Sequence, residues 1–89
     1  MITQEIKITN RLGLHARPAA MVAQTAADFD CDIKIAKDRL EINAKSIMGV
    51  MMLAAEYGST LKLCFDGKDE KAACEAITRL FAQNFNEEY

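Results

Sequence analysis

The apolar residues of this chain change their spacing repeatedly, and that change constrains the fold more than any other feature. Ile2, Ile6 and Ile8 lie on one side of an alternating stretch, which is the pattern of a half-buried strand. From Ala16 to Ala27 the apolar residues recur every three or four positions instead, as on one face of a helix. The same reasoning predicts strands over 2–8, 31–36, 40–42 and 60–66, and helices over 16–27, 47–57 and from Asp69 onward.

The predicted elements follow the order βαββαβα. Ser46 is a favourable N-cap for the helix over 47–57, and Gly58 stands where a left-handed C-terminal cap belongs. Elements with a single apolar face predict a two-layer α+β open-faced sandwich, in which three helices cover one face of a four-stranded antiparallel sheet. The 89 residues suit one domain over 1–89.

The composition and charge of the chain argue against several classes of protein. The net charge of -2 gives no general reason to expect a nucleic-acid partner. The first ten residues lack the cationic and apolar regions of a secretory signal, and no apolar run is long enough for a membrane helix, so we expect a cytoplasmic protein without membrane insertion. Cys31, Cys64 and Cys74 form neither a disulfide framework nor a zinc motif, and we interpret them as buried thiols.

His15 is the only histidine of the chain, and it directly precedes the predicted helix over 16–27. The first backbone N–H groups of a helix have no intrahelical partners, and they carry the positive end of the helix dipole. This environment disfavours the cationic imidazolium, so the ring should be a neutral nucleophile near pH 7. The same N–H groups would receive a phosphate bound to that ring.

The neighbours of His15 complete a predicted phosphate cradle. Arg17 can donate two N–H bonds to phosphate oxygens, and Pro18 fits the first turn of a helix, where its missing N–H costs nothing. Gly13 gives the loop conformational freedom, and Leu14 can anchor it in the core. The backbone of Ala16 belongs to the same first turn.

A histidine at the start of a helix also has a simpler interpretation, in which it caps the helix or lies on the surface. A metal site and a hydrolytic triad both lack the necessary residues, because the chain has no second histidine and no glycine-rich phosphate loop. The chemistry that remains is covalent phosphorylation of His15 itself.

Two stretches carry a resemblance to a known family. Residues 13–19, GLHARPA, are similar to the active-site signature of the histidine-containing phosphocarrier (HPr) family of the bacterial phosphoenolpyruvate-dependent phosphotransferase system. Residues 45–51, KSIMGVM, resemble the regulatory-serine segment of that family. The predicted order of elements also matches the HPr fold over the whole chain.

The resemblance implies specific roles. His15 would receive a phosphoryl group on Nδ1 from phosphorylated enzyme I and pass it to a histidine or cysteine of an enzyme II component, such as a IIA domain. Ala16, Arg17 and Pro18 would form the phosphate-binding turn. Such a protein is a phosphoryl-transfer intermediate rather than a conventional enzyme, it requires no metal or other cofactor, and it is most simply a monomer.

The segment after Ser46 is unusually apolar. We expect core packing to account for most of its six large residues, which are Ile47, Met48, Val50, Met51, Met52 and Leu53. An exposed remainder, with Ile47, Met48 and Met51 as the candidates, would dock partner proteins. Ser46 is either an N-cap alone or also the target of an ATP-dependent HPr kinase/phosphorylase, which the resemblance implies.

Alternatives remain open at this point. The chain could be a regulatory binding module that acts only through phosphorylated Ser46, or a small α+β domain in which His15 and Arg17 merely cap a helix. Gln24 and Ala27 stand where HPr proteins often carry lysines, and residues 84–89 are similar to the nitrogen-related branch of the family. The sugar and nitrogen branches are therefore both possible destinations of the phosphoryl group.

Overall fold

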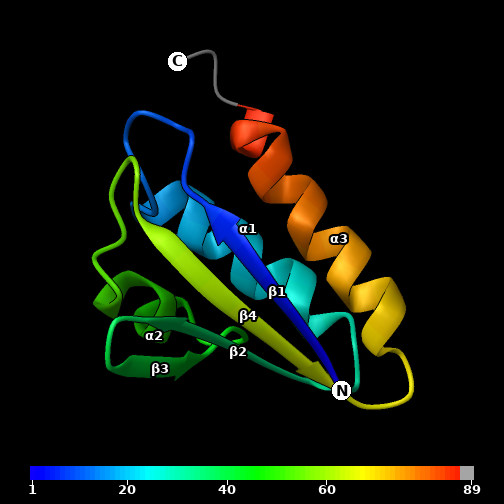
Figure 1. Cartoon of the computed structure of the whole chain (residues 1–89). Helices are drawn as coiled ribbons and strands as arrows, with labels where there is room; N and C mark the ends of the chain where they lie inside the picture. Colours follow the sequence, from blue (N-terminus) through cyan, green and yellow to red (C-terminus); the bar gives the residue numbers. More distant parts are fainter. Residues whose placement is uncertain (87–89) are drawn as a thin grey trace.

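The computed structural model describes residues 1–86, so part of the acidic carboxyl end, residues 87–89, lies outside the described residues. Helices and strands alternate in the predicted order (Figure 1). The strands are β1 (Ile2–Lys7), β2 (Asp32–Lys37), β3 (Leu40–Asn43) and β4 (Thr60–Asp66). The helices are α1 (Ala16–Ala27), α2 (Ile47–Met52) and α3 (Glu70–Ala82), and a short 3-10 segment, η1 (Asn84–Asn86), follows them.

The four strands form one antiparallel sheet in the order β1-β4-β2-β3. Within residues 1–86, β4 is therefore the last strand in sequence but a central one in the sheet, and β1 pairs with β4 alone, with Ile2 opposite Phe65 and Ile6 opposite Leu61. Figure 1 shows α1 and α3 side by side across the sheet. The predicted two-layer α+β sandwich, with a four-stranded antiparallel sheet and three helices, is confirmed.

The core lies between the sheet and the helices. Leu61, Leu63 and Phe65 of β4 are fully buried, as their alternation predicts, and burial of side chains of this size stabilises the fold by about 1.5–3 kcal/mol each. The face that α1 buries is made mostly of alanine and valine, so the helix can lie close to its neighbours. None of the helices formed by residues 1–86 is long and apolar enough to cross a membrane.

The end of the second helix differs from the prediction. The helix was expected over 47–57, but α2 ends at Met52, and Ala54 has a left-handed φ of 49°. The Lys37 ammonium donates to the carbonyls of Leu53 and Ala54, at 3.3 and 3.2 Å, and so replaces the helical donors that a longer helix would supply. Tertiary contacts therefore end the helix despite its helix-forming sequence.

Gly58 is consequently not the cap of α2. It has a φ of 88°, as expected for a left-handed position, but it lies in the turn before β4. Its N–H donates to the Ile8 carbonyl at 2.9 Å, and the Ile8 N–H donates to the Ser59 carbonyl at 2.8 Å. The turn thus pairs with the end of β1 and helps to position the loop that follows β1.

The three cysteines are free thiols, but only one is fully buried. Cys31 is buried, whereas Cys64 and Cys74 are half-buried, so the interpretation as buried thiols holds for Cys31 alone. Burial raises the pKa of Cys31 to about 11, and its hydrogen bond to Asp69 acts in the same direction. Cys31 is therefore a thiol rather than a thiolate at neutral pH.

Asp69 joins the start of α3 to the segment before β2. Its carboxylate does not cap its own helix. Instead it accepts hydrogen bonds from the backbone N–H groups of Asp30 and Cys31, at 2.8 and 2.9 Å. These bonds favour the ionised carboxylate, and the pKa of Asp69 therefore lies below its ordinary value of 3.8, with the Asp30 N–H as the largest cause.

We expect Asp69→Ala to lower the free energy of unfolding at pH 7, and the difference from wild type to shrink in acid. A carboxylate whose pKa is lower in the folded state stabilises the fold fully above its unfolded pKa, near 3.8. That contribution is lost as the pH falls through the folded pKa. Urea unfolding of both proteins at pH 7 and at steps below pH 3.8 measures the difference, with Asp66→Ala as an exposed aspartate control. A constant difference down to the lowest pH would contradict the assignment.

Candidate functional site

The helix α1 begins at Ala16, so His15 is its N-cap residue. The His15 backbone is extended, with φ of -78° and ψ of -171°, and its carbonyl accepts the N–H of Ala19 at 2.9 Å. Pro18 has no N–H, and Ala16 and Arg17 therefore supply the backbone donors of the first turn. The imidazole of His15 is half-buried and makes no capping hydrogen bond to the helix. The interpretation of His15 as a mere cap is not supported.

The loop before His15 is held by hydrogen bonds at both ends. Gly13 has a φ of 66°, and a Cβ there would lie 2.4 Å from the Ala55 carbonyl oxygen, so the loop requires glycine. The Leu14 N–H donates to that same oxygen at 2.8 Å, and the Leu14 side chain is buried, as expected of an anchor. The Leu14–Ala55 hydrogen bond ties the loop to the segment that follows α2, and the close approach at Gly13 is to the same segment.

Asn10 is a site residue that the sequence analysis missed. It is the one polar residue of the described chain with a fully buried side chain, 1% exposed. Its Nδ2 donates to the Gly13 carbonyl at 2.9 Å, and its own carbonyl accepts the Gly13 N–H at 3.2 Å. These two bonds close a tight turn that fixes the direction in which the chain enters α1. An asparagine beside an arginine and a leucine, directly after a strand, was the available signal.

Arg17 reaches a part of the chain that is remote in sequence. Its Nη1 donates to the backbone carbonyl of Phe85 at 3.1 Å, between residues 68 positions apart. Pro18 is fully buried, so it shapes the first turn from inside the core, whereas Ala16 is exposed. Of the predicted cradle, His15, Ala16 and Arg17 thus remain at the surface at the start of α1.

Ser46 is the N-cap of α2, as predicted. Its Oγ accepts the Gly49 N–H at 3.0 Å, and the residue is exposed. A hydroxyl at this place supports the first turn of the helix while remaining accessible to a modifying protein.

The expectation that core packing takes most of the large residues after Ser46 is wrong. Only Val50 and Leu53 of the six are buried, because a helix of six residues presents little more than one turn to the core. The three docking candidates, Ile47, Met48 and Met51, are exposed, with Met48 at 72%. Met52 and Leu12, which the sequence analysis did not select, are 64% and 54% exposed.

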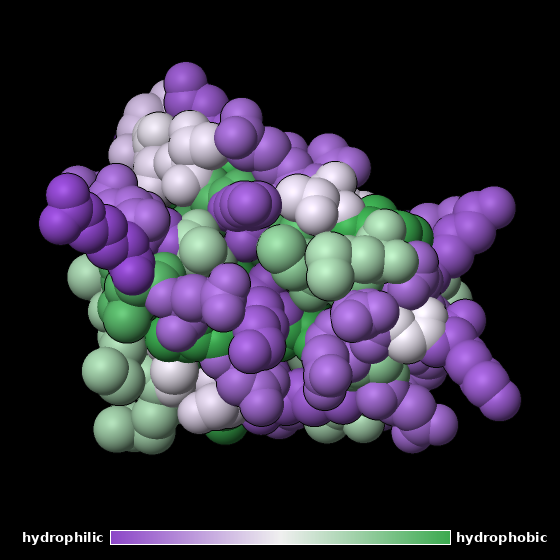
Figure 2. All heavy atoms as spheres, turned by 60° about the horizontal axis from the view of Figure 1, so that its bottom comes forward, coloured by the Kyte–Doolittle hydropathy of each residue, from purple (hydrophilic) through white to green (hydrophobic). Residues whose placement is uncertain are grey.

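We call Leu12, Ile47, Met48, Met51 and Met52 the apolar patch. Its α2 members belong to a helix that packs against α1, and the Leu14–Ala55 hydrogen bond joins the loop of Leu12 to the end of α2. Figure 2 shows apolar atoms gathered at the left of the molecule, the side on which α2 lies in Figure 1. The patch and the start of α1 therefore belong to one connected surface region.

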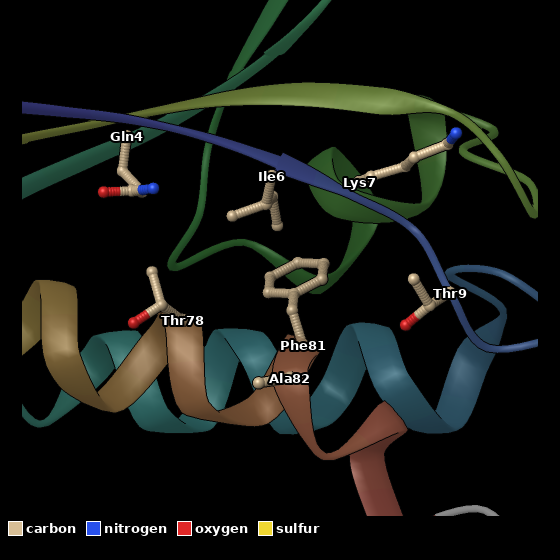
Figure 3. A pocket seen from close by; sticks show the side chains of 7 residues that line it. All are labelled: Gln4, Ile6, Lys7, Thr9, Thr78, Phe81 and Ala82. Atoms are coloured by element: carbon tan, nitrogen blue, oxygen red, sulfur yellow. The ribbon is translucent and has the colours of Figure 1, made fainter.

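A separate cleft lies between β1 and α3 (Figure 3). It is lined by Gln4, Ile6, Lys7, Thr9, Thr78, Phe81 and Ala82, none of which was expected to belong to a functional site. Within residues 1–86, no three His, Cys, Asp or Glu side chains are grouped so that they could hold a metal ion.

Comparisons with known proteins agree with this geometry. Residues 2–83 match the family described as the PTS HPr component phosphorylation site. The phosphocarrier protein HPr of Treponema pallidum is 50% identical over 88 residues, which cover 99% of this chain and 100% of the relative. The HPr-like protein Crh of Halalkalibacterium halodurans is 46% identical over 77 residues, or 86% of this chain and 92% of that protein.

The solved structures agree as well. A crystal structure of HPr from Thermoanaerobacter tengcongensis superimposes with a TM-score of 0.96 at 45% identity and covers 100% of both chains. HPr from that organism has also been solved as a dimer, with a TM-score of 0.79 at 46% identity over 92% of this chain and 94% of the other. By sequence over its whole length and by fold, this chain belongs to the HPr family of phosphocarrier proteins.

Proposed function

We propose that His15 accepts a phosphoryl group from phosphorylated enzyme I and passes it to enzyme II components, so that the chain serves as a phosphocarrier of the phosphotransferase system. The observation that carries the proposal is the placement of His15. Its imidazole lies at the start of α1 without capping the helix, and Arg17 follows two residues later. The N–H groups of Ala16 and Arg17 and the guanidinium can then receive the phosphoryl oxygens.

The transfer needs only positioning and charge from this chain. A ring nitrogen of His15, Nδ1 by resemblance to the family, forms a bond to phosphorus as the bond between phosphorus and the donor histidine breaks. The donor nitrogen keeps the electron pair of the broken bond, and the second nitrogen of the His15 ring keeps its proton. In the second transfer the bond between His15 and phosphorus breaks as the acceptor residue of an enzyme II component bonds to phosphorus, so the cradle must bind the phosphoryl group without trapping it. An exposed first turn with one guanidinium meets that requirement.

Mass spectrometry of the intact protein tests the proposal. After incubation with phosphoenolpyruvate and enzyme I, we expect one added phosphate that is lost in mild acid, as a phosphohistidine is. Subsequent addition of a IIA domain should remove the phosphate from this chain and place it on the IIA domain. An unmodified chain under conditions that label a known HPr would refute the proposal.

We infer that the apolar patch docks these partners. Three of its members are methionines, whose flexible side chains suit one surface that must fit several proteins in turn. Gln24 and Ala27 of α1 are both exposed and uncharged, so the patch rather than lysine pairing carries most of the contact.

We place the protein in the cytoplasm with these partners, where its three free thiols stay reduced. We further infer that residues 1–89 act as one domain and, in transfer, as a monomer.

A second candidate function is regulatory binding through phosphorylated Ser46. It is favoured by the exposed hydroxyl beside the apolar patch, and the HPr-like protein Crh is among the relatives. Phosphorylation adds a charge of about -1.5 to -2 at a helix N-terminus, which tolerates it, so the effect would fall on partners rather than on the fold. Incubation with ATP and HPr kinase/phosphorylase tests the modification, with Ser46→Ala as the unmodified control.

We expect Ser46→Asp to slow phosphorylation of His15 by enzyme I severalfold, while Ser46→Asn leaves the rate near that of wild type. Both side chains are good N-caps that can replace the bond to the Gly49 N–H, so they should be equally stable. They differ only in charge, which acts on encounter with an acidic partner surface. Initial rates at limiting enzyme I measure the effect, and equal rates for the two variants would exclude a role for charge at position 46.

A further inference from the structure

Three consecutive residues after α3 have left-handed backbones. Asn84, Phe85 and Asn86 have φ values of 50°, 56° and 61°. Asparagine adopts this conformation readily, but a phenylalanine does so rarely because its Cβ crowds the following carbonyl. Phe85 must therefore be held in this conformation by contacts with the rest of the molecule.

Those contacts come from three sides. The Phe85 side chain is 1% exposed and packs edge-to-face on Phe81, with the ring centroids 4.9 Å apart. The Thr9 hydroxyl donates to Oδ1 of Asn84, and the Asn86 N–H donates to the Gln83 carbonyl at 2.9 Å. Figure 3 shows Phe81 pointing from α3 toward Ile6 of β1, and Thr9 above the end of α3. The turn over 84–86 is thus held both by α3 and by the segment that follows β1.

The turn over 84–86 fixes the position of the Phe85 carbonyl oxygen. The Phe85 carbonyl oxygen accepts Nη1 of Arg17 at 3.1 Å. A neutral carbonyl leaves the positive charge of the guanidinium in place, and it uses one of five N–H groups. The contact therefore restrains a long side chain through a neutral acceptor.

We propose that Phe85 is a positioning residue of the phosphocarrier site. The turn over 84–86 holds its carbonyl where it orients the Arg17 guanidinium at the start of α1, before the phosphoryl group arrives. Because the Arg17 side chain is already ordered before the phosphoryl group arrives, the transfer step does not include the cost of its lost rotamer freedom, and transfer is faster. The proposal rests on the proposed function of His15, because it assigns Phe85 a role in the same reaction.

Two substitutions of one residue test it. Asn86→Pro cannot adopt a φ of 61°, and it lacks the N–H that bonds to the Gln83 carbonyl. Asn86→Gly retains both the N–H and the left-handed conformation. We expect transfer from enzyme I to His15 to slow about two- to twelvefold in Asn86→Pro, the range for one immobilised side chain, and to stay at the wild-type rate in Asn86→Gly.

A spectroscopic signal separates positioning from general damage. In ¹H–¹⁵N spectra the Arg17 Nε–Hε resonance, assigned by its loss in Arg17→Lys, should move toward the position of a flexible arginine in Asn86→Pro and stay in place in Asn86→Gly. Arg39, in the turn between β2 and β3, serves as the internal reference. Thermal unfolding establishes that each variant is folded.

Thr9 provides an independent route should Asn86→Pro fail to fold. Thr9→Val removes the hydroxyl that bonds to Asn84, and Thr9→Ser keeps it. The valine variant should show the same slower transfer and the same Arg17 shift, whereas the serine variant should match wild type. Folded proline and valine variants that transfer at the wild-type rate would overturn the positioning role, whatever the Arg17 resonance does. A wild-type protein that takes no phosphate would instead remove the carrier function itself.

Discussion

His15→Ala should fold normally and accept no phosphate from phosphoenolpyruvate and enzyme I. His15 is the only histidine of the chain, so no second imidazole can replace the nucleophile. The loss should be complete rather than partial, because Arg17 and the helix N–H groups bind a phosphoryl group but cannot form a bond to phosphorus. Stability should change by only about 0.5 kcal/mol, since the imidazole does not cap the helix.

His15→Asn separates chemistry from stability. Asparagine is among the best N-caps, and at this position it can accept a helix N–H that the imidazole leaves to other acceptors, which should stabilise the protein by about 1 kcal/mol. The asparagine variant should nevertheless be as inactive as the alanine variant. Intact mass gives the phosphate content and urea unfolding gives the stability. An acid-labile phosphate on either variant would place the nucleophile elsewhere.

Gly13→Ala should give the second large effect, by moving the loop that carries His15. The new Cβ would lie 2.4 Å from the Ala55 oxygen and 2.8 Å from Cα of Glu56, and both are backbone atoms that cannot rotate away. The steric clash can be removed only if the loop shifts and the Leu14–Ala55 hydrogen bond stretches or breaks. Together with the positive φ, this should lower the free energy of unfolding by about 3 kcal/mol.

Phosphorylation of Gly13→Ala should slow by about tenfold or more, because the reacting imidazole is only two residues away and a shift of about 1 Å is costly in a positioned reaction. Gly58→Ala is the matched control. Gly58 also has a positive φ, 88°, but its new Cβ would meet nothing within 4 Å. That variant should lose about 1 kcal/mol of stability and keep its transfer rate. Equal effects of the two alanines on transfer would show that backbone strain, not the Ala55 contact, governs the site.

The elements whose boundaries depend on local pattern could be predicted from the sequence. α1 begins at Ala16 because Pro18 fixes a first turn and small apolar residues repeat at helical spacing, and β4 alternates its residues in and out of the core. His15, Arg17 and Ser46 were found by the same local chemistry. Each of these features is determined by a few residues that are neighbours in the sequence.

The features that were missed depend on contacts between distant residues. The end of α2 is set by Lys37 on the carbonyls of Leu53 and Ala54, and nothing within residues 47–57 indicates that donor. The Phe85 carbonyl meets Arg17 only after α3 has packed on the sheet. Asn10 looks like an ordinary turn residue until its burial is known. Local patterns thus selected the candidate site residues, but not the contacts that hold them in place.

The position of β4 in the sheet has a consequence for biosynthesis. Among the strands of residues 1–86, β1 is synthesised before the other three, yet β4, with which it pairs, is synthesised after them. Until residue 66 has emerged, β1 cannot pair, and the loop that follows it lacks the Ala55 and Ser59 contacts that shape it. Since sheet closure joins residues so far apart in sequence, the four-stranded sheet cannot form until β4 has been synthesised. A nascent chain therefore carries His15 before the contacts that shape the loop in front of it have formed.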